Sequence, residues 1–148
     1  MDTTVVPAEA GTDLDIEAEV VGAIRGLDIV RPTHAEVNVS VRQGHVALTG
    51  IVPSIFAAIE VERAVRATPG VTGVTNKLFD DGSLTRRVAH ALITDPRTKD
   101  IPPGYSVTCF FGHVGVIGHF ASEPAKTAVA EVCQSIEGVR GVKVVTMN

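Results

Sequence analysis

Apolar and polar residues alternate with two different periods along the chain. An apolar stripe at Ile16, Val20, Ile24 and Leu27 recurs every three or four residues, which predicts an amphipathic helix. A period of two follows in residues 37–42, where valines alternate with Asn, Ser and Arg. That alternation is typical of a strand with one buried face.

The next segments complete a small unit. Gly44 marks a turn into a second strand at 45–52, which predicts a β-hairpin. Ser54 is placed to cap a second helix, Gly70 to end it, and a last strand covers 73–79. The unit therefore reads helix-strand-strand-helix-strand. We expect an α+β fold with a mixed three-stranded sheet and both helices on one face.

The whole pattern occurs twice. A shift of 68 positions aligns residues 16–80 with the second half of the chain without a gap. Identical pairs include Val39/Val107, His45/His113, Val46/Val114, Ser54/Ser122 and Val61/Val129. Chance is a poor explanation for such a match, so the chain is a tandem duplication.

The helix boundaries follow from local capping signals. Asp13 or Asp15 is placed to cap the first helix, and Ser83 its counterpart in the second copy. Asp95-Pro96 stops that counterpart, and Ser122 caps the last helix. Gly138 then leads into a final strand at 141–147.

Glycines recur at the turns and strand ends of both copies. They are Gly44, Gly50, Gly70 and Gly73, with Gly112, Gly118, Gly138 and Gly141 in the second copy. Together with the Gly-His-Val hairpin start, the Ser-capped helix and the terminal Gly-Val-x-Gly-Val, this pattern resembles the BON domain (bacterial OsmY and nodulation family). The resemblance implies one domain at 14–80 and another at 82–148, after a flexible acidic N-terminus at 1–13. The family's Asn in the last strand is present as Asn76 and replaced by Val144.

The resemblance implies a non-enzymatic binding module. Such domains are linked to phospholipid or membrane-surface attachment, to envelope and osmotic stress, and to chaperone-like protein contacts. A cytoplasmic member of the family binds potassium, so an ion or small-ligand binding protein is the alternative. The family brings no shared catalytic, cofactor or metal residue, and we expect none here.

Composition and charge narrow the choice of partners. The 148 residues carry a formal charge of −4, and the six carboxylates of residues 1–19 concentrate the acidity at one end. The remainder is nearly balanced, which argues against nucleic acid but allows contact with membrane phospholipid or a protein. We expect a monomer or weak homo-oligomer. No enzyme motif is present, and the N-terminus lacks a secretory signal, so we expect a cytoplasmic protein, or a periplasmic one if a signal was removed.

Four residues are candidates for contact with lipid or a partner. Phe110 and Phe111 precede the second hairpin glycine, where the first copy has polar residues, and exposed aromatics there suit a lipid interface. The alternative is packing against the other repeat. His45 and His113 each begin a strand and could together bind a metal or sense pH if the repeats pack with pseudo-twofold symmetry; the simpler interpretation is two solvated residues on the polar face.

The two cysteines occupy apolar positions. Cys109 lies on the inward side of a strand, and Cys133 on the inward stripe of the following helix. Both align with valines, which indicates small buried thiols, and a disulfide between them is the alternative.

Overall fold

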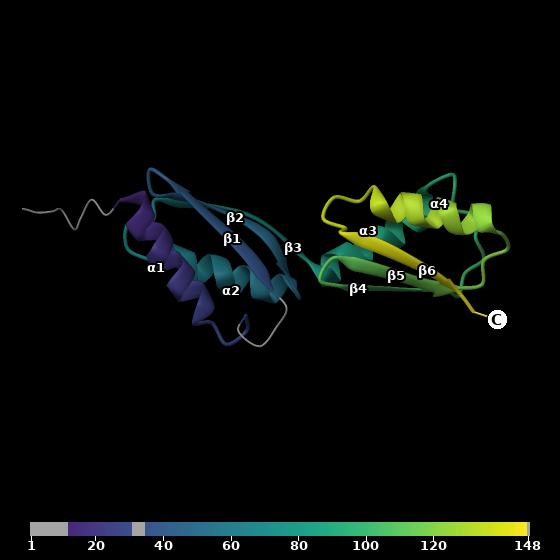
Figure 1. Cartoon of the computed structure of the whole chain (residues 1–148), viewed down its shortest axis with the longest axis horizontal. Coiled ribbons are helices and arrows are strands. Elements are labelled where there is room, and N and C mark those ends of the chain that lie inside the picture. Colours follow the sequence, from purple (N-terminus) through teal and green to yellow (C-terminus); the bar gives the residue numbers. More distant parts are fainter. Residues whose placement is uncertain (1–11, 31–34, 148) are drawn as a thin grey trace, which may run out of the picture. The chain divides into compact units, whose positions relative to one another are not determined.

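The duplication predicted from the sequence is present in the structure. The computed structural model describes residues 12–30 and 35–147, and the predicted flexible segment 1–13 falls almost wholly outside them. The elements, shown in Figure 1, are α1 (Asp13–Arg25), β1 (Glu36–Arg42), β2 (His45–Val52), α2 (Ile55–Arg66), β3 (Gly73–Asp80), α3 (Asp81–Thr94), β4 (Ser106–Phe110), β5 (His113–Gly118), α4 (Glu123–Gln134) and β6 (Gly141–Thr146). They form two compact units, Met1–Leu78 and Phe79–Asn148.

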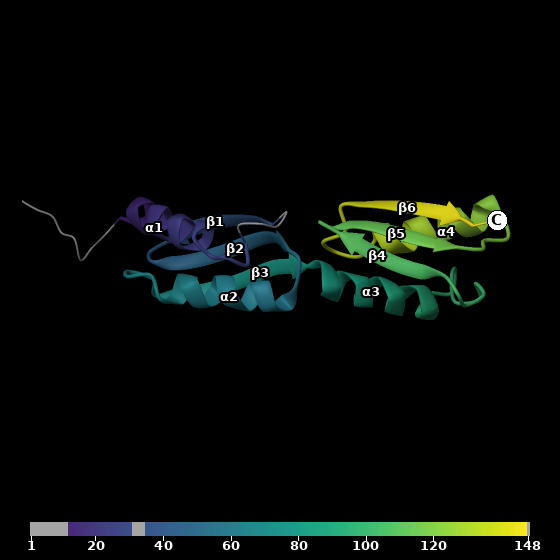
Figure 2. The ribbon, with the colours of Figure 1, turned by 90° about the horizontal axis from the view of Figure 1, so that it is seen from below.

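Each unit contains one three-stranded sheet whose second strand is central. The strand orders are β1-β2-β3 and β4-β5-β6. β1 pairs with β2 and β4 with β5 in antiparallel fashion, whereas β6 runs parallel to β5. The two helices of a unit contact each other and cover one side of their sheet; Figure 2 shows α2 and α3 along their respective sheets. The predicted α+β class and mixed sheet are thus confirmed.

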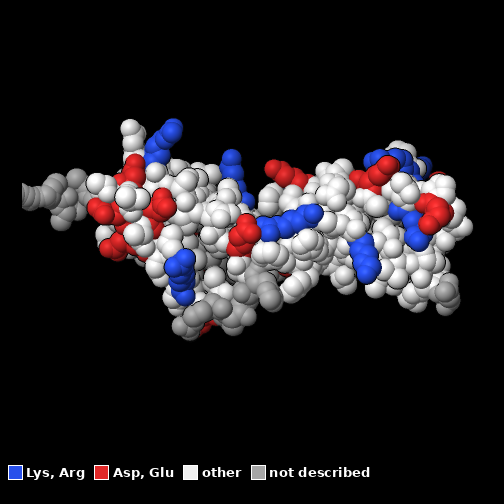
Figure 3. Space-filling view, in the orientation of Figure 1, with Lys and Arg blue, Asp and Glu red and all other residues white. Residues whose placement is uncertain are grey.

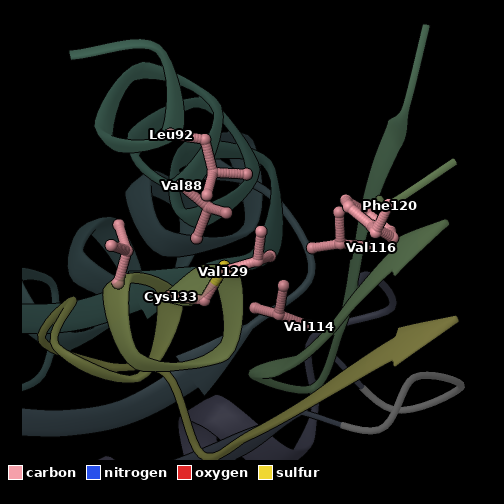
Figure 4. Packing of buried hydrophobic residues seen from close by; sticks show 8 residues of the cluster. Val88, Leu92, Val114, Val116, Phe120, Val129 and Cys133 are labelled. Atoms are coloured by element: carbon pink, nitrogen blue, oxygen red, sulfur yellow. The ribbon is translucent and has the colours of Figure 1, made fainter. Parts of the chain in front are cut away.

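The predicted apolar stripes form the core of each unit. In the second unit, α3 and α4 bury their apolar faces against β5, as Figure 4 shows. That cluster consists of Val88, Leu92, Val114, Val116, Phe120, Val129, Val132 and Cys133. The equivalent cluster of the first unit consists of Ile16, Val20, Ile24, Val46, Leu48, Val61 and Val65. The side chains on the other face of each strand point away from the helices.

Two of the predicted helix caps are wrong and two are confirmed. Ser54 and Ser122 cap α2 and α4 by accepting hydrogen bonds from backbone N–H groups of the first turn. The caps of α1 and α3 are instead Thr12 and Asp80. Asp80 closes β3 in an extended conformation, which is the backbone geometry a cap needs, so the helix starts earlier than Ser83.

One further boundary also differs from the prediction, namely the end of α2. α2 ends at Arg66 with Ala67 as its cap, and Gly70 follows three residues later at a φ of +92°. Gly70 therefore turns the chain toward β3 rather than ending the helix.

Candidate functional site

The two hairpins share an unusual backbone. Gln43-Gly44 and Phe111-Gly112 each form a two-residue loop between paired strands. Both glycines have a φ of +80°, and both Gln43 and Phe111 have a φ of +53°. Positive φ at both loop residues is the type I′ turn, which matches the twist of the flanking strands. A phenylalanine is rare in this left-handed region, where a non-glycine residue costs about 1–3 kcal/mol.

A carboxylate from a distant helix holds each loop in place. The Asp81 side chain accepts hydrogen bonds from the backbone N–H of Phe111 at 2.8 Å and of Gly112 at 2.9 Å. Asp13 accepts the same pair from Gln43 at 2.9 Å and Gly44 at 3.0 Å. Both carboxylates stand at the first residue of a helix, so they bind α1 and α3 to the tips of their hairpins. The sequence predicts only a capping role for Asp13, not a contact with the hairpin.

One of the two thiols contacts this arrangement. The Cys109 Sγ atom donates to the Asp81 carboxylate at 3.3 Å, and burial together with this bond raises the pKa of Cys109 to about 12. Cys133 lies fully buried between the helices and the sheet, and burial raises its pKa to about 11. Both cysteines are free thiols. The raised pKa values favour the protonated thiol at both positions, which disfavours a role as nucleophile.

The two phenylalanines occupy different environments at the hairpin tip. Phe110 is 63% exposed and lies on the face of β4 that points away from the core. Phe111 is half-buried, and the guanidinium of Arg140 lies 4.5 Å from the centre of its ring. A cation over an aromatic face at this distance is attractive. The tip therefore combines an exposed aromatic ring with a second ring paired to a cation.

Phe110 shares the outer face of the second sheet with two apolar residues that lie at the opposite end of the strands. We call the side of β4–β6 that points away from α3 and α4 the second open face. The strand register aligns Phe110 with His113, and it aligns Ser106 with Ile117 and Val145. Val145 is 38% exposed, and Ile117 is half-buried. The first sheet has polar counterparts at the three apolar positions, namely Arg42, Thr49 and Lys77.

The three strands of this face carry charges of one sign. β4, β5 and β6 contain no aspartate or glutamate and carry Lys143. Arg140 immediately precedes β6. In the first sheet, by contrast, β1 and β3 contain Glu36 and Asp80. Figure 3 shows acidic side chains gathered over the first unit around α1.

The duplicated histidines lie at the start of the central strands. His45 is exposed, and its Nε2 atom lies 2.7 Å from the Thr75 hydroxyl of the neighbouring strand. A Cβ atom added to Gly73 would come within 2.9 Å of the His45 ring, and one added to Gly141 within 3.0 Å of the His113 ring. Each glycine thus makes room for an imidazole. The residues that the structure describes include no group of three metal-ligating side chains.

Two of the predicted structural glycines stand where an added side chain would collide with a neighbouring residue. Gly50 has a φ of +121°, and an added Cβ would lie 2.1 Å from the carbonyl oxygen of Glu36. Gly118 has no such backbone constraint, but an added Cβ would lie 2.6 Å from the Cβ of Tyr105. Gly138 is packed under the ring of Phe79.

One apolar surface was missed from the sequence. Ile55, Phe56 and Ile59 project from the first half of α2 and are 56%, 60% and 48% exposed. They lie off the buried stripe of this helix, and only comparison with the residues at the same positions of α4 marks them out. Those counterparts are Glu123, Pro124 and Thr127.

The fold is a tandem pair of small α+β domains. Comparison with protein families shows that the chain belongs to the BON domain family, which it matches twice, over residues 12–78 and 80–146. A BON domain is a binding module and is not known as catalytic. No helix in the described residues is long and apolar enough to cross a membrane.

Solved structures with the same fold come from a secretion apparatus. The chain resembles two structures of CdsD, a structural protein of the type III secretion system of Chlamydia trachomatis, with TM-scores of 0.65 and 0.64 at 17% and 16% identity. The match covers 90% and 92% of this chain but only 61% and 65% of those chains. At this identity the likeness establishes the fold alone. A comparison with curated protein sequences finds no match.

Proposed function

We propose that this protein binds the surface of anionic phospholipid membranes as a non-enzymatic module, and that the second open face and its hairpin tip make the contact. The observation that carries the proposal is the pair Phe110-Phe111 at a tip where the first repeat has Arg42-Gln43. Phe111 is held at a φ of +53°, which disfavours a bulky residue. The strained backbone at this phenylalanine destabilises the fold, and strained residues cluster at functional sites. A binding role for Phe111 accounts for its presence here.

The charges favour an anionic lipid surface. Arg140 lies beside Phe111, Lys143 lies on the open face, and the three strands contribute no carboxylate. Aromatic side chains sit well at the boundary between headgroups and acyl chains, and each nearby cation adds about 1 kcal/mol of attraction to an anionic leaflet. Aromatic and basic groups together therefore suit the surface of an anionic membrane better than that of a neutral membrane.

The size of the face also favours lipid over a stable protein dimer. Strands lie about 4.8 Å apart and rise about 3.3 Å per residue, so three short strands present a face of roughly 250–300 Å². A stable protein interface buries about 800 Å² on each partner. Insertion of a few apolar side chains into a lipid interface needs no comparable area.

The family gives the proposal a wider setting. BON domains are associated with membrane or phospholipid binding and with stress-related proteins. We extend that association to this chain as a role in envelope or osmotic stress. We also place the protein in the cytoplasm, where it would meet the inner leaflet of the membrane.

Vesicle co-sedimentation tests the proposal. The probe is phosphatidylcholine vesicles with or without phosphatidylglycerol, and the variant is Phe110→Ser/Phe111→Asn, since asparagine tolerates the left-handed turn. We expect the wild type to sediment with anionic vesicles, less so at high salt, and the variant to lose most of that binding. The matched control, Arg42→Ser/Gln43→Asn, should bind like the wild type.

Melting temperatures complete the test. Asparagine at position 111 should lower the strain in the turn by about as much free energy as the lost contact with Arg140 costs. The double variant should therefore melt near the temperature of the wild type. Equal sedimentation of wild type and variant would refute the proposal. A cation-specific rise in melting temperature without vesicle binding would point to the ion-binding alternative instead.

A further inference from the structure

A groove runs between α1 and β1 in the first unit. It encloses about 360 Å³, and its apolar walls include Val21 and Ile24 from the helix and Val37 and Val39 from the strand. Glu17 and Arg25 also line it. The groove is separate from the second open face, because all of these residues belong to the first unit.

The strand beside the groove is the edge of its sheet. β1 pairs with β2 on one side, and no strand of the described residues lies on its other side. The two-residue hairpin makes Arg42 and His45 the last hydrogen-bonded pair, so the alternation of an antiparallel ladder leaves the peptide groups of Val37, Val39 and Val41 directed outward. These outward groups lie along the groove. An edge strand beside an apolar groove can accept an extended peptide as an added strand.

In the second unit, the loop that follows α3 is held against the helix and the core. Thr98 is only 2% exposed and donates its hydroxyl to the carbonyl of Leu92 at 2.8 Å, and Ile101 packs against the core. The first-unit counterpart of Thr98 is Val30, which is half-buried and lines the groove.

Opposite charges at the two ends of the groove favour one orientation of a bound strand. Asp13 at the start of α1 binds the tip of the hairpin, so α1 runs antiparallel to β1. Glu17 therefore lies toward the hairpin end of the groove, and Arg25 toward the first residues of β1. A strand added antiparallel to β1 would bring its N-terminal end to Glu17 and its C-terminal end to Arg25.

We propose that the α1–β1 groove binds an extended segment of a partner protein by strand addition. The partner segment pairs its backbone with the outward peptide groups of Val37 and Val39. It places an apolar side chain in the groove at every second residue, with a basic residue near Glu17 and an acidic residue near Arg25. This site is independent of the membrane surface proposed above.

Synthetic hexapeptides test the proposal by NMR on the full chain. The first peptide begins with lysine, alternates valine and threonine, and ends with glutamate; the second exchanges its two charged ends; the third carries N-methyl groups on alternate backbone amides. We expect the first peptide to shift the amide signals of β1 and of Val21. The charge-exchanged peptide should bind at least about threefold more weakly, and the N-methylated peptide should not bind.

Substitutions locate the site. Val21→Glu should abolish the shifts, whereas Ala89→Glu at the matched position of the second unit should leave them intact. Because Val21→Glu can disturb folding, Arg25→Ala is the second variant: it should retain binding of the first peptide but reduce its preference over the charge-exchanged one. The proposal is overturned if no peptide shifts β1, or if the N-methylated peptide binds as well as the first.

Discussion

The carboxylate of Asp81 accepts a hydrogen bond from the backbone N–H of Gly112, thirty-one positions along the chain, at 2.9 Å. Asp13 and Gly44 repeat this relationship at 3.0 Å in the first unit. In both units the first residue of a helix therefore fixes the tip of a hairpin, and with it the side chain that occupies the first loop position. Phe111 stands in a turn whose backbone is fixed by hydrogen bonds to the Asp81 side chain.

Removal of this carboxylate should destabilise the second unit. Asp81→Asn keeps one acceptor oxygen but turns an amide N–H₂ toward a backbone donor. A hydrogen bond to a charged group is worth about 1.5–3 kcal/mol, so we expect a loss of about that size in the free energy of unfolding. Urea denaturation of the full chain, followed by circular dichroism, measures it.

Two further variants make that measurement specific. Asp13→Asn should cost less, because Gln43 is exposed while Phe111 is half-buried. Asp15→Asn, two residues from Asp13 and outside the loop contacts, should change stability little. Equal stability of Asp81→Asn and wild type would show that the loop does not depend on the carboxylate.

Substitution by alanine should destabilise the protein at Gly50, which lies in a strand, and stabilise it at Gly22, which lies in a helix. At Gly50, alanine would meet the Glu36 carbonyl at 2.1 Å in a backbone conformation with a φ of +121°. We expect a loss of about 1–3 kcal/mol from the backbone strain alone, and more from the contact. Gly22 lies in α1 with nothing within 4 Å of an added Cβ, so alanine there should add about 0.5–1 kcal/mol. Thermal melts of both variants test this; a Gly50→Ala protein as stable as Gly22→Ala would contradict the geometry.

The two thiols should make the protein less stable in alkali. In the folded protein the pKa of Cys109 is raised to about 12 and that of Cys133 to about 11, against an ordinary value of 9.0. Because the thiols are harder to ionise in the folded protein, they contribute to its stability. This contribution to the free energy of unfolding is fully present below pH 9 and is lost as the pH rises through 11 to 12. The decline should start near pH 9.

Valine substitution isolates this effect. Cys109→Val/Cys133→Val introduces the residues of the first repeat, Val41 and Val65, and should fold normally at pH 7. Between pH 9 and 11 the free energy of unfolding should fall less steeply in the variant than in the wild type. Parallel slopes for the two proteins would exclude the thiols as the cause.

The sequence predicts most of the fold because duplication repeats every signal. The stripes of Ile16 and Val88, the hairpins at Gly44 and Gly112, and the serine caps all depend on local patterning, and the structure confirms them. The caps at Thr12 and Asp80 were assigned to neighbouring residues. Several acidic or hydroxyl side chains adjoin each helix start, and only the backbone conformation selects among them.

Long-range contacts were harder to foresee. Asp13 and Asp81 are also identical residues 68 positions apart, but they lie just outside the aligned segment and look like ordinary first-turn acids. Their partners are thirty residues away, so no local pattern reveals them. The Ile55 and Phe56 surface was hidden for a different reason, since a helix can carry apolar residues outside its buried stripe. The candidate contacts of Phe110, Phe111, His45 and His113 remain predictions.

The most direct test of membrane binding by the second open face is the fluorescence of a single tryptophan. The chain contains none, so Phe110→Trp supplies a conservative reporter at the hairpin tip, and Arg42→Trp supplies its counterpart in the first repeat. With phosphatidylglycerol vesicles, emission of Phe110→Trp should shift to shorter wavelength and be quenched by brominated acyl chains, while Arg42→Trp should show neither change. Unchanged emission from Phe110→Trp, or an equal response from both variants, would contradict the proposed membrane contact.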